Sequence, residues 1–477
     1  MSDQTAQPDS TKSSRGDLGE SSPSGGPAGG VSRRGLLRAA GAGAAVVGGG
    51  GLLEACSSSI KGATSSSSSS STAGASTQAI VIGFIHPLTG ALGDFGTSDN
   101  WIIKTIQATP QYKNGFKIGG KTYPVTIKSY DTQSDATRAG NLANQAILTD
   151  KVDLIVTSST PETVNPVATV AEKLGTPTIC GNVPWQAWYA NLGGNPTPGK
   201  STFKPTFTTM YFLGVNDLCN SFIPMWNKIH SQLGTDKNVA CLFPNDSDGN
   251  AFRAAWPLFA GPAGYTLVDP PAYTDGLTNY TSFISEFKSK NCEFFTNVQL
   301  PPDFNVFWKQ AAQQGYKPKL ATVAKVLLFP SDVTALGSLV NNVATDAWWT
   351  PNMPWKSSLT GQTCMEIANA YTSDTGQQWV QSLSNYSLFE VAYAAMQMVN
   401  NPHDKTEVAA ALFKVNMEAL AGKLDWTTSK PAPGVVDTPC VGVQWKPNSK
   451  YGWSMEVVDN TLMPEVPLTG TLEPTNK

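Results

Sequence analysis

The sequence is poor in charge and in histidine, and both shortages restrict its function. Only 14% of its 477 residues are charged, whereas soluble proteins usually carry about a quarter. Lys and Arg number 33 against 36 Asp and Glu, so there is no basic excess to neutralise nucleic-acid phosphates. The only histidines are His86, His230 and His403, which leaves little for a histidine-built metal centre. We therefore expect no nucleic-acid partner, no metal and no cofactor.

Several common catalytic motifs are missing as well. The chain has no G-x-S-x-G elbow, no H-E-x-x-H pair and no G-x-G-x-x-G fingerprint. A Ser/His/Asp set remains open, but only His86 comes at the end of a predicted strand. We interpret His86 as a polar group at the edge of a cleft. The prediction is a binding protein rather than an enzyme.

The N-terminal region has the composition of an export signal and a tether. Residues 1–31 are rich in Ser, Gly and Pro. Arg33 and Arg34 follow, and after them comes an uncharged stretch at 39–53. This stretch is shorter than the ~20 residues of a membrane-spanning helix. The paired arginines resemble a twin-arginine signal, and Leu-Glu-Ala before Cys56 resembles a lipobox. We expect a disordered leader and signal over 1–55, a Ser-rich tether over 56–78, and a lipid on Cys56 that holds the protein at the outer face of the cell membrane. The alternative is that Cys56 is incidental and a soluble protein is released.

Six further cysteines follow Cys56. An even number in an oxidising compartment indicates up to three disulfides. The alternative is that they are small buried hydrophobic residues. The six are Cys180, Cys219, Cys241, Cys292, Cys364 and Cys440.

From residue 79 onwards the pattern alternates between strand and helix. The continuous apolar run 79–85 is typical of a strand covered on both faces. Residues 152–156 are a further predicted strand, and helical patterns lie at 136–147 and 162–174. The alternation restarts at 238–243. We predict an α/β fold with two Rossmann-like lobes, each a parallel sheet flanked by helices, and a ligand cleft at the carboxyl ends of the strands.

An ordered set of short motifs resembles the branched-chain amino-acid-type substrate-binding proteins of ABC transporters. The opening Ile-Val-Ile-Gly-Phe-Ile-His-Pro-Leu-Thr-Gly at 80–90 and Asp-Thr-Gln-Ser-Asp at 131–135 belong to the set, as do Gly-Thr-Pro at 175–177 and Gly-Lys-Leu-Asp at 422–425. The resemblance implies the type I periplasmic-binding fold, with two lobes joined by three crossovers that close on a ligand. We place the crossovers near 203–207, 347–353 and 426–432. Lobe 1 is then 79–205 plus 353–428, lobe 2 is 206–352 plus 429–466, and 467–477 is a tail.

The resemblance also implies contact residues on the first lobe. Ser158, Ser159 and Thr160 begin a predicted helix whose N-terminus would bind a carboxylate, although Pro161 and Glu162 in its first turn weaken that use. Asn182 and Trp185 follow the next strand, and Phe95 matches an aromatic residue at the cleft mouth. The alternatives are an ordinary capped helix and a tryptophan packed in the lobe core.

On the second lobe the resemblance implies contacts at Asp248, Gln299 and Lys325, each at or after the end of a predicted strand. Asp248 is where a ligand ammonium or amide would bind. Trp348 and Trp349 lie at the second crossover, where they line the hinge or brace it.

We hypothesise an extracytoplasmic solute-binding protein that captures an amino acid or a related small amide or acid and delivers it to an ABC permease. Three alternatives stay open: a binder of aromatic acids, a ligand-sensing subunit, and a surface-anchored hydrolase using the same cleft. Except through its lipid, the protein is expected to have no contact with the membrane.

Overall fold

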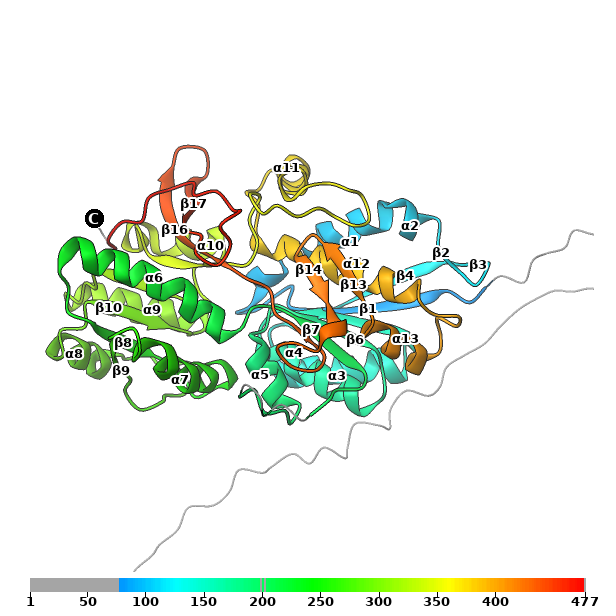
Figure 1. The fold of residues 1–477 in the computed structure, drawn as a ribbon, viewed down its shortest axis with the longest axis horizontal. Coiled ribbons are helices and arrows are strands. Elements are labelled where there is room, and N and C mark those ends of the chain that lie inside the picture. The colour runs from blue at the N-terminus through cyan, green and yellow to red at the C-terminus, as the bar shows by residue number, and fades with distance from the viewer. Residues whose placement is uncertain (1–76, 198–199, 201–202, 476–477) are drawn as a thin grey trace, which may run out of the picture. The chain divides into compact units, whose positions relative to one another are not determined.

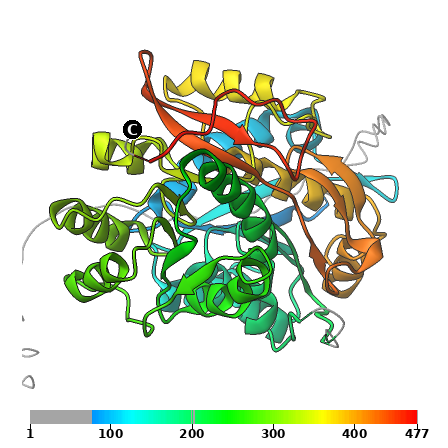
Figure 2. The ribbon, with the colours of Figure 1, turned by 60° about the vertical axis from the view of Figure 1, so that its left-hand side comes forward.

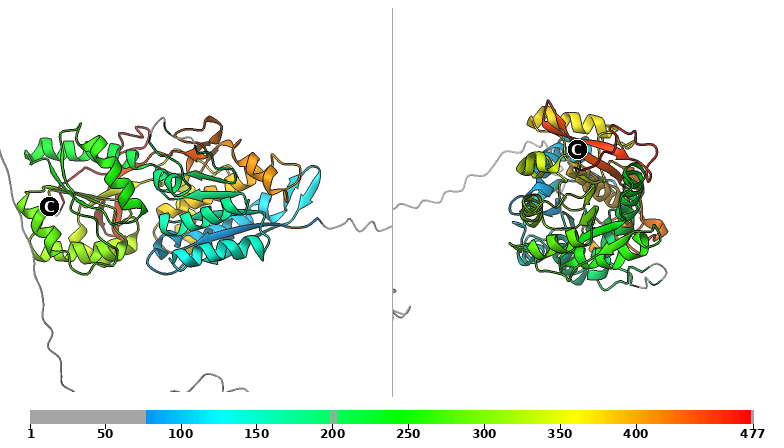
Figure 3. Two further views of the ribbon diagram at one scale, coloured as in Figure 1. Left: turned by 90° about the horizontal axis from the view of Figure 1, so that it is seen from below. Right: turned by 90° about the vertical axis from the view of Figure 1, so that its left-hand side faces the viewer.

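A computed structural model describes residues 77–197, 200 and 203–475. The described part is an α/β structure with two large sheets, each covered by helices (Figure 1; Figure 3). This confirms the predicted fold class. The leader 1–55, most of the tether 56–78, and Arg33, Arg34 and Cys56 lie outside the described residues.

The sheet of the first lobe has six parallel strands in the order β15-β7-β6-β5-β1-β4. Its central strands read as apolar runs because both faces are covered, and in β1 Phe84 and Ile85 are fully buried. The strands are β1 (Ile80–His86), β4 (Val125–Asp131), β5 (Leu154–Ser158), β6 (Thr178–Gly181), β7 (Thr208–Tyr211) and β15 (Val435–Val436).

Helices cover both faces of this sheet, and two small hairpins extend the lobe. Helix α3 begins as the sequence indicates, because the Asp135 side chain accepts a hydrogen bond from Arg138 N at 2.6 Å. The helices are α1 (Asp99–Ala108), α2 (Pro110–Lys113), α3 (Ala136–Leu148), α4 (Pro161–Lys173), α5 (Trp185–Asn191), α11 (Cys364–Thr375), α12 (Tyr386–Met396) and α13 (Lys405–Leu412), with the 3-10 turns η1 (Gly93–Gly96), η3 (Gln381–Asn385) and η4 (Trp426–Thr428). The hairpins are β2 (Phe116–Ile118) with β3 (Lys121–Tyr123), and β13 (Asn416–Ala419) with β14 (Gly422–Asp425).

The sheet of the second lobe has seven strands in the order β17-β16-β12-β11-β10-β8-β9. Five strands from β12 to β9 are parallel, and the hairpin β16–β17 adds antiparallel strands at one edge (Figure 2). The strands are β8 (Asn238–Leu242), β9 (Thr266–Val268), β10 (Phe294–Asn297), β11 (Leu320–Val323), β12 (Ala344–Ala347), β16 (Val441–Asn448) and β17 (Gly452–Asp459). The helices are α6 (Val215–Leu233), α7 (Ser247–Ala260), α8 (Thr281–Ser289), α9 (Pro301–Gln313) and α10 (Pro330–Leu336), with the turn η2 (Gly337–Val340).

Two of the three predicted crossovers lie too early in the chain. Strand β7 pairs with β6, and β15 pairs with β7, so both belong to the first sheet. The chain therefore passes between the sheets at 212–214 and 437–440, rather than near 203–207 and 426–432. Strand β15 has only two residues, and β7 reads Thr-Thr-Met-Tyr, which lacks the continuous apolar run of β1. The second passage follows β12, at the predicted place.

The predicted tail, 467–477, packs on the second lobe as far as it is described. Thr469 N donates to Val457 O at 3.0 Å, and Thr475 N donates to Lys319 O at 2.9 Å. Among the described helices, none is both long and apolar enough to cross a membrane.

The expectation of disulfides is wrong for the described chain. All six cysteines from Cys180 to Cys440 are free thiols in buried positions. The alternative interpretation holds, because these residues pack as small hydrophobic side chains. Burial raises the pKa of the Cys180 thiol to about 12 and that of Cys292 to about 12, so both are poor nucleophiles.

Candidate functional site

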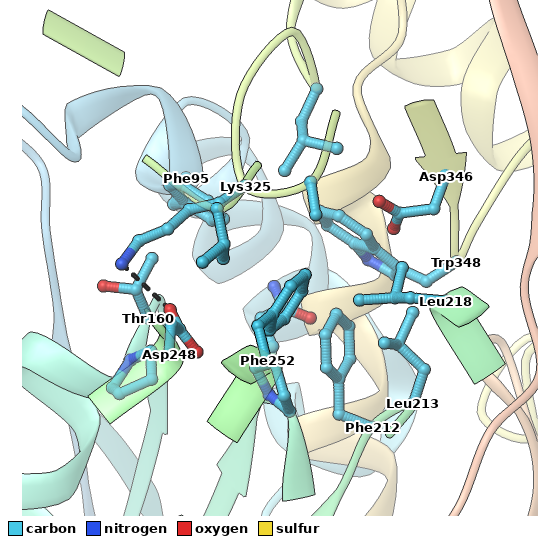
Figure 4. A pocket seen from close by; sticks show the side chains of 16 residues that line it. Phe95, Thr160, Phe212, Leu213, Leu218, Asp248, Phe252, Lys325, Asp346 and Trp348 are labelled. Atoms are coloured by element: carbon cyan, nitrogen blue, oxygen red, sulfur yellow. Dashed lines mark ion pairs between the residues drawn. The ribbon is translucent and has the colours of Figure 1, made fainter. Parts of the chain in front are cut away.

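A small cavity lies where residues of the two lobes meet. It has a volume of about 40 Å³, enough for only a few water molecules. Figure 4 shows Lys325, Thr160 and Asp248 at one end of it and mostly apolar side chains at the other, where Asp346 also lies. Its lining consists of Phe95, Thr160, Pro161, Asn182, Pro184, Phe212, Leu213, Leu218, Asp248, Phe252, Val298, Ala324, Lys325, Leu328, Asp346 and Trp348.

The polar end is built around the ammonium group of Lys325, which follows β11. Its Nζ lies 2.6 Å from Glu162 Oε1, 2.9 Å from Asp248 Oδ2 and 3.7 Å from Asp246 Oδ2. Glu162 is in the first turn of α4 on the first lobe, whereas Asp246 caps α7 on the second. The side chain of Lys325 is only 4% exposed. One buried cation thus joins carboxylates of both lobes.

Backbone geometry holds this lysine in place. Lys325 has a φ of +68°, and Asn182, on the opposite lobe, has a φ of +58°. A positive φ is uncommon for residues other than glycine, and such conformations gather at functional sites, where the surrounding structure enforces them. Both residues line the cavity.

The charges in this cluster shift one another's protonation. Burial opposes the charge on Lys325, but Asp248, Glu162 and Asp246 outweigh it and raise the pKa of the ammonium well above its usual value. Burial also opposes ionisation of Glu162, yet Lys325 holds its pKa below the ordinary value. For Asp248, burial and the neighbouring carboxylates outweigh Lys325 and raise the pKa to about 7. At neutral pH the lysine and Glu162 are therefore charged, while Asp248 is partly protonated.

Aromatic side chains from both lobes form the apolar end. Phe212 lies edge-on to Trp348 with ring centroids 5.2 Å apart, and Phe252 lies beside them in Figure 4. At the mouth, Phe95 of the first lobe lies edge-on to Phe329 of the second at 5.0 Å. The Trp348 Nε1–H donates to Ser384 Oγ at 3.0 Å, which leaves the ring face to pack against apolar groups.

Five of the nine predicted contact residues line the cavity: Phe95, Thr160, Asn182, Asp248 and Lys325. The other four are Ser158, Ser159, Gln299 and Trp185, none of which is part of its lining. Ser158 Oγ instead donates to Asn385 Oδ1 at 2.8 Å, and Gln299 Oε1 accepts from Asn297 Nδ2 at 3.1 Å.

Trp185 borders a second, larger hollow between α5 and α7. This hollow has a volume of about 650 Å³ and a largely apolar lining that includes Ala187, Ala251, Leu258 and Phe259. The aromatic side chains in the lining of the small cavity are Phe95, Phe212, Phe252 and Trp348, and Trp185 is not among them.

Most of the apolar lining could not be predicted from the sequence. Phe212 and Leu213 lie in the first crossover, which was placed too early, and Phe252 lies on α7, where an apolar residue is typical of core packing. The partnership of Glu162 with Lys325 was missed too, because the two are far apart in sequence and meet only across the lobes.

His86 is not at the edge of the cleft but fully buried. Its Nδ1 lies 2.8 Å from Asp99 Oδ2 and its Nε2 lies 2.7 Å from Ser129 Oγ. Asn385 Nδ2 donates to the other oxygen of Asp99 at 2.8 Å. These hydrogen bonds connect Ser, His and Asp as in a hydrolase triad. None of Ser129, His86 and Asp99 lines the cavity, however. The network instead links β1, β4, α1 and η3.

One string matches the spacing of a phosphate-binding loop. Residues 194–201 read Gly-Asn-Pro-Thr-Pro-Gly-Lys-Ser, but a phosphate-binding loop follows a strand and opens a helix. Here the preceding element is helix α5 and the next is strand β7. We assign no phosphate-binding role to this segment.

Comparison with known proteins agrees with this architecture. The family model described as periplasmic binding protein matches residues 79–450. A leucine binding protein, LivK, from Thermotoga maritima shares 17% identity at a TM-score of 0.62, covering 80% of this chain and 99% of its own. LivJ from Streptococcus pneumoniae, a branched-chain amino acid transporter substrate binding protein in complex with isoleucine, shares 16% at 0.60, covering 80% and 99%.

A third similar structure has a different kind of ligand. The solute binding protein of an ABC transporter from Rhodopseudomonas palustris, in complex with 3,4-dihydroxy benzoic acid, shares 17% identity at a TM-score of 0.59, covering 80% of this chain and 96% of its own. At such identities these structures establish the fold. With the family model covering most of the sequence, this chain belongs to the periplasmic binding protein family.

Proposed function

We propose that the protein is an extracytoplasmic solute-binding protein that captures a small ligand between its lobes and delivers it to the permease subunits of an ABC transporter. The observation that carries this proposal is the two-ended cavity, where Glu162 from one lobe meets Lys325 and Asp248 from the other beside an aromatic wall. Such a site suits a molecule with a polar head and an apolar body.

The ligand is an amino acid or a related small amide or acid. The volume of about 40 Å³ is too small for such a ligand, so we expect the lobes to separate at the three crossovers to admit it. An aromatic acid is a second candidate, because Phe212, Phe252 and Trp348 offer ring faces and edges on which a planar ligand would pack.

The N-terminal motifs complete the proposal. Export through the paired arginines Arg33 and Arg34, followed by lipid attachment at Cys56, would hold the binding lobes at the outer face of the cell membrane. The serine-rich stretch after Cys56 would act as a flexible tether that lets the lobes reach a permease. A sensing subunit would have the same anchor and differ only in its partner.

A thermal-shift screen of amino acids, amides and aromatic acids tests the binding function. A ligand at about 100 times its Kd stabilises the folded state by about 2.7 kcal/mol, which raises the Tm by several degrees. Binding is then measured by calorimetry, and the ligand is recovered and analysed. Unchanged ligand supports a binding protein. Turnover of the ligand by the purified protein would instead support the hydrolase, and no shift with any compound would contradict the proposed function.

A further inference from the structure

The position expected to hold a ligand's ammonium already contains one. Asp248 was the residue predicted to bind such a group, and its Oδ2 lies 2.9 Å from Lys325 Nζ (Figure 4). The same ammonium reaches Glu162 on the other lobe at 2.6 Å. The chain thus supplies its own cation to the carboxylates of the cleft.

An amino-acid zwitterion has no complementary site in this arrangement. Its ammonium would compete with Lys325, which is tied to the same carboxylates and buried with them. Its carboxylate would lie among Glu162, Asp246 and Asp248, which repel it. The N-terminus of α4 offers no alternative, because Pro161 lacks an N–H there and Glu162 already complements the helix dipole.

The cluster nevertheless keeps unpartnered acceptors beside a donor, because Glu162 Oε2, Asp246 Oδ2 and Asp248 Oδ1 are all buried without a hydrogen-bond partner among the described residues. The carboxylate of Asp248 is only 3% exposed. Lys325 carries three N–H donors, and two carboxylate oxygens lie within hydrogen-bond distance of it. A neutral group with a carbonyl and an N–H on the same carbon matches such a pair.

We propose that the ligand of this cleft is a small apolar molecule with a neutral carboxamide-type head, and that Lys325 is the residue that sets this specificity. The head's carbonyl accepts from Lys325 and its NH₂ donates to Asp248 Oδ1. The apolar body packs against Phe212, Phe252 and Trp348. This inference rests on the proposed function, since it names the ligand class of the same cavity.

Matched ligands test the head group while the body stays constant. We would measure binding of isovaleramide, isovalerate, isoamylamine and leucine to the purified full-length chain by calorimetry, and repeat the series with phenylacetamide, phenylacetate, phenethylamine and phenylalanine. We expect the amides to bind at least about tenfold more tightly than the matched acids, amines and amino acids, because each of those leaves a buried donor or acceptor unpaired. Tighter binding of an acid, amine or amino acid in either series would overturn the inference.

Replacement of the lysine should reverse the order. In Lys325→Met the carboxylates of Glu162 and Asp248 lose their internal cation, so we expect amide binding to fall at least about tenfold and amine binding to rise. Lys317→Met, on an exposed lysine, is the matched control and should keep the wild-type order. An unchanged order in Lys325→Met would contradict the role of the lysine, and if that variant does not fold, the wild-type series decides.

The ligand released from protein purified from its native source separates the two proposals. A neutral amide-type molecule in its mass spectrum supports both. A zwitterion or a carboxylate leaves the binding function standing and overturns the inference. If no compound of any class binds and none is released, the proposed function itself fails.

Discussion

Replacing Asp332 by asparagine should stabilise the protein at alkaline pH and not at acid pH. Asp332 lies in the first turn of α10 on the second lobe and is buried. Burial and the neighbouring Asp94 of the first lobe outweigh the N–H groups of Phe329 and Leu328, and they raise its pKa from 3.8 to about 7. Because the folded state disfavours the charged form, the stabilisation present below pH 4 is lost as pH rises towards and through 7.

The size of the effect follows from the pKa. A rise from 3.8 to about 7 corresponds to at most about 4 kcal/mol of folding free energy above pH 7. An asparagine has nearly the same shape and never ionises. We expect Asp332→Asn to gain about 2–4 kcal/mol over the wild type at pH 8.5 and about zero at pH 4.

Urea unfolding of both proteins between pH 4 and pH 8.5 measures this difference. Asp135→Asn, at the exposed cap of α3, is the control and should show no such rise with pH. If Asp332→Asn is equally or less stable than the wild type at pH 8.5, or if its advantage is the same at pH 4, the account of the Asp94–Asp332 contact is wrong.

Three further predictions concern other parts of the chain. Lys325→Met should lower the free energy of unfolding by about 3–5 kcal/mol at pH 8, because it leaves buried carboxylates without their cation. The loss should be much smaller at pH 5, where Asp248 is protonated. Equal losses in denaturation curves at both pH values would contradict this. Trp226→Ala should cost about 3–5 kcal/mol, since the ring stacks on Trp256 at 4.9 Å and is fully buried; a loss below 1 kcal/mol on urea unfolding would refute that packing. The six described thiols are buried, so iodoacetamide should label them only after unfolding. Labelling of the native protein, or a fall in its Tm on addition of dithiothreitol, would count against free buried cysteines.

The sheets could be predicted from sequence because their central strands are covered on both faces. A run such as residues 80–85 is apolar throughout for that reason, and the cap at Asp135 marks the start of α3. Strands β7 and β15 were not recognised, because Thr-Thr-Met-Tyr is not a continuous apolar run and β15 has only two residues, and two crossovers were misplaced as a result. The cysteines gave no signal of their pairing state, because an even count fits disulfides and buried thiols equally.

The site was predictable where a residue follows a strand and not where it depends on the lobes coming together. Asp248 and Lys325 could be proposed because each follows a strand, at a position where the family resemblance implies a ligand contact. Their mutual ion pair, and the reach of Lys325 to Glu162, depend on distances between segments that no local pattern encodes. Phe212 and Trp348 likewise face each other only because two crossovers pass side by side.

Native mass spectrometry of the protein from its producing cells tests the central claim most directly. The account predicts one small molecule bound per chain of the wild type. The bound molecule should be lost or strongly reduced in Trp348→Ala, which removes an aromatic side chain from the cavity lining. It should be retained in Trp379→Ala, because Trp379 is not part of that lining. A wild-type protein that carries no small molecule and binds none of the screened compounds, or a ligand held equally by both variants, would contradict a solute site between the lobes.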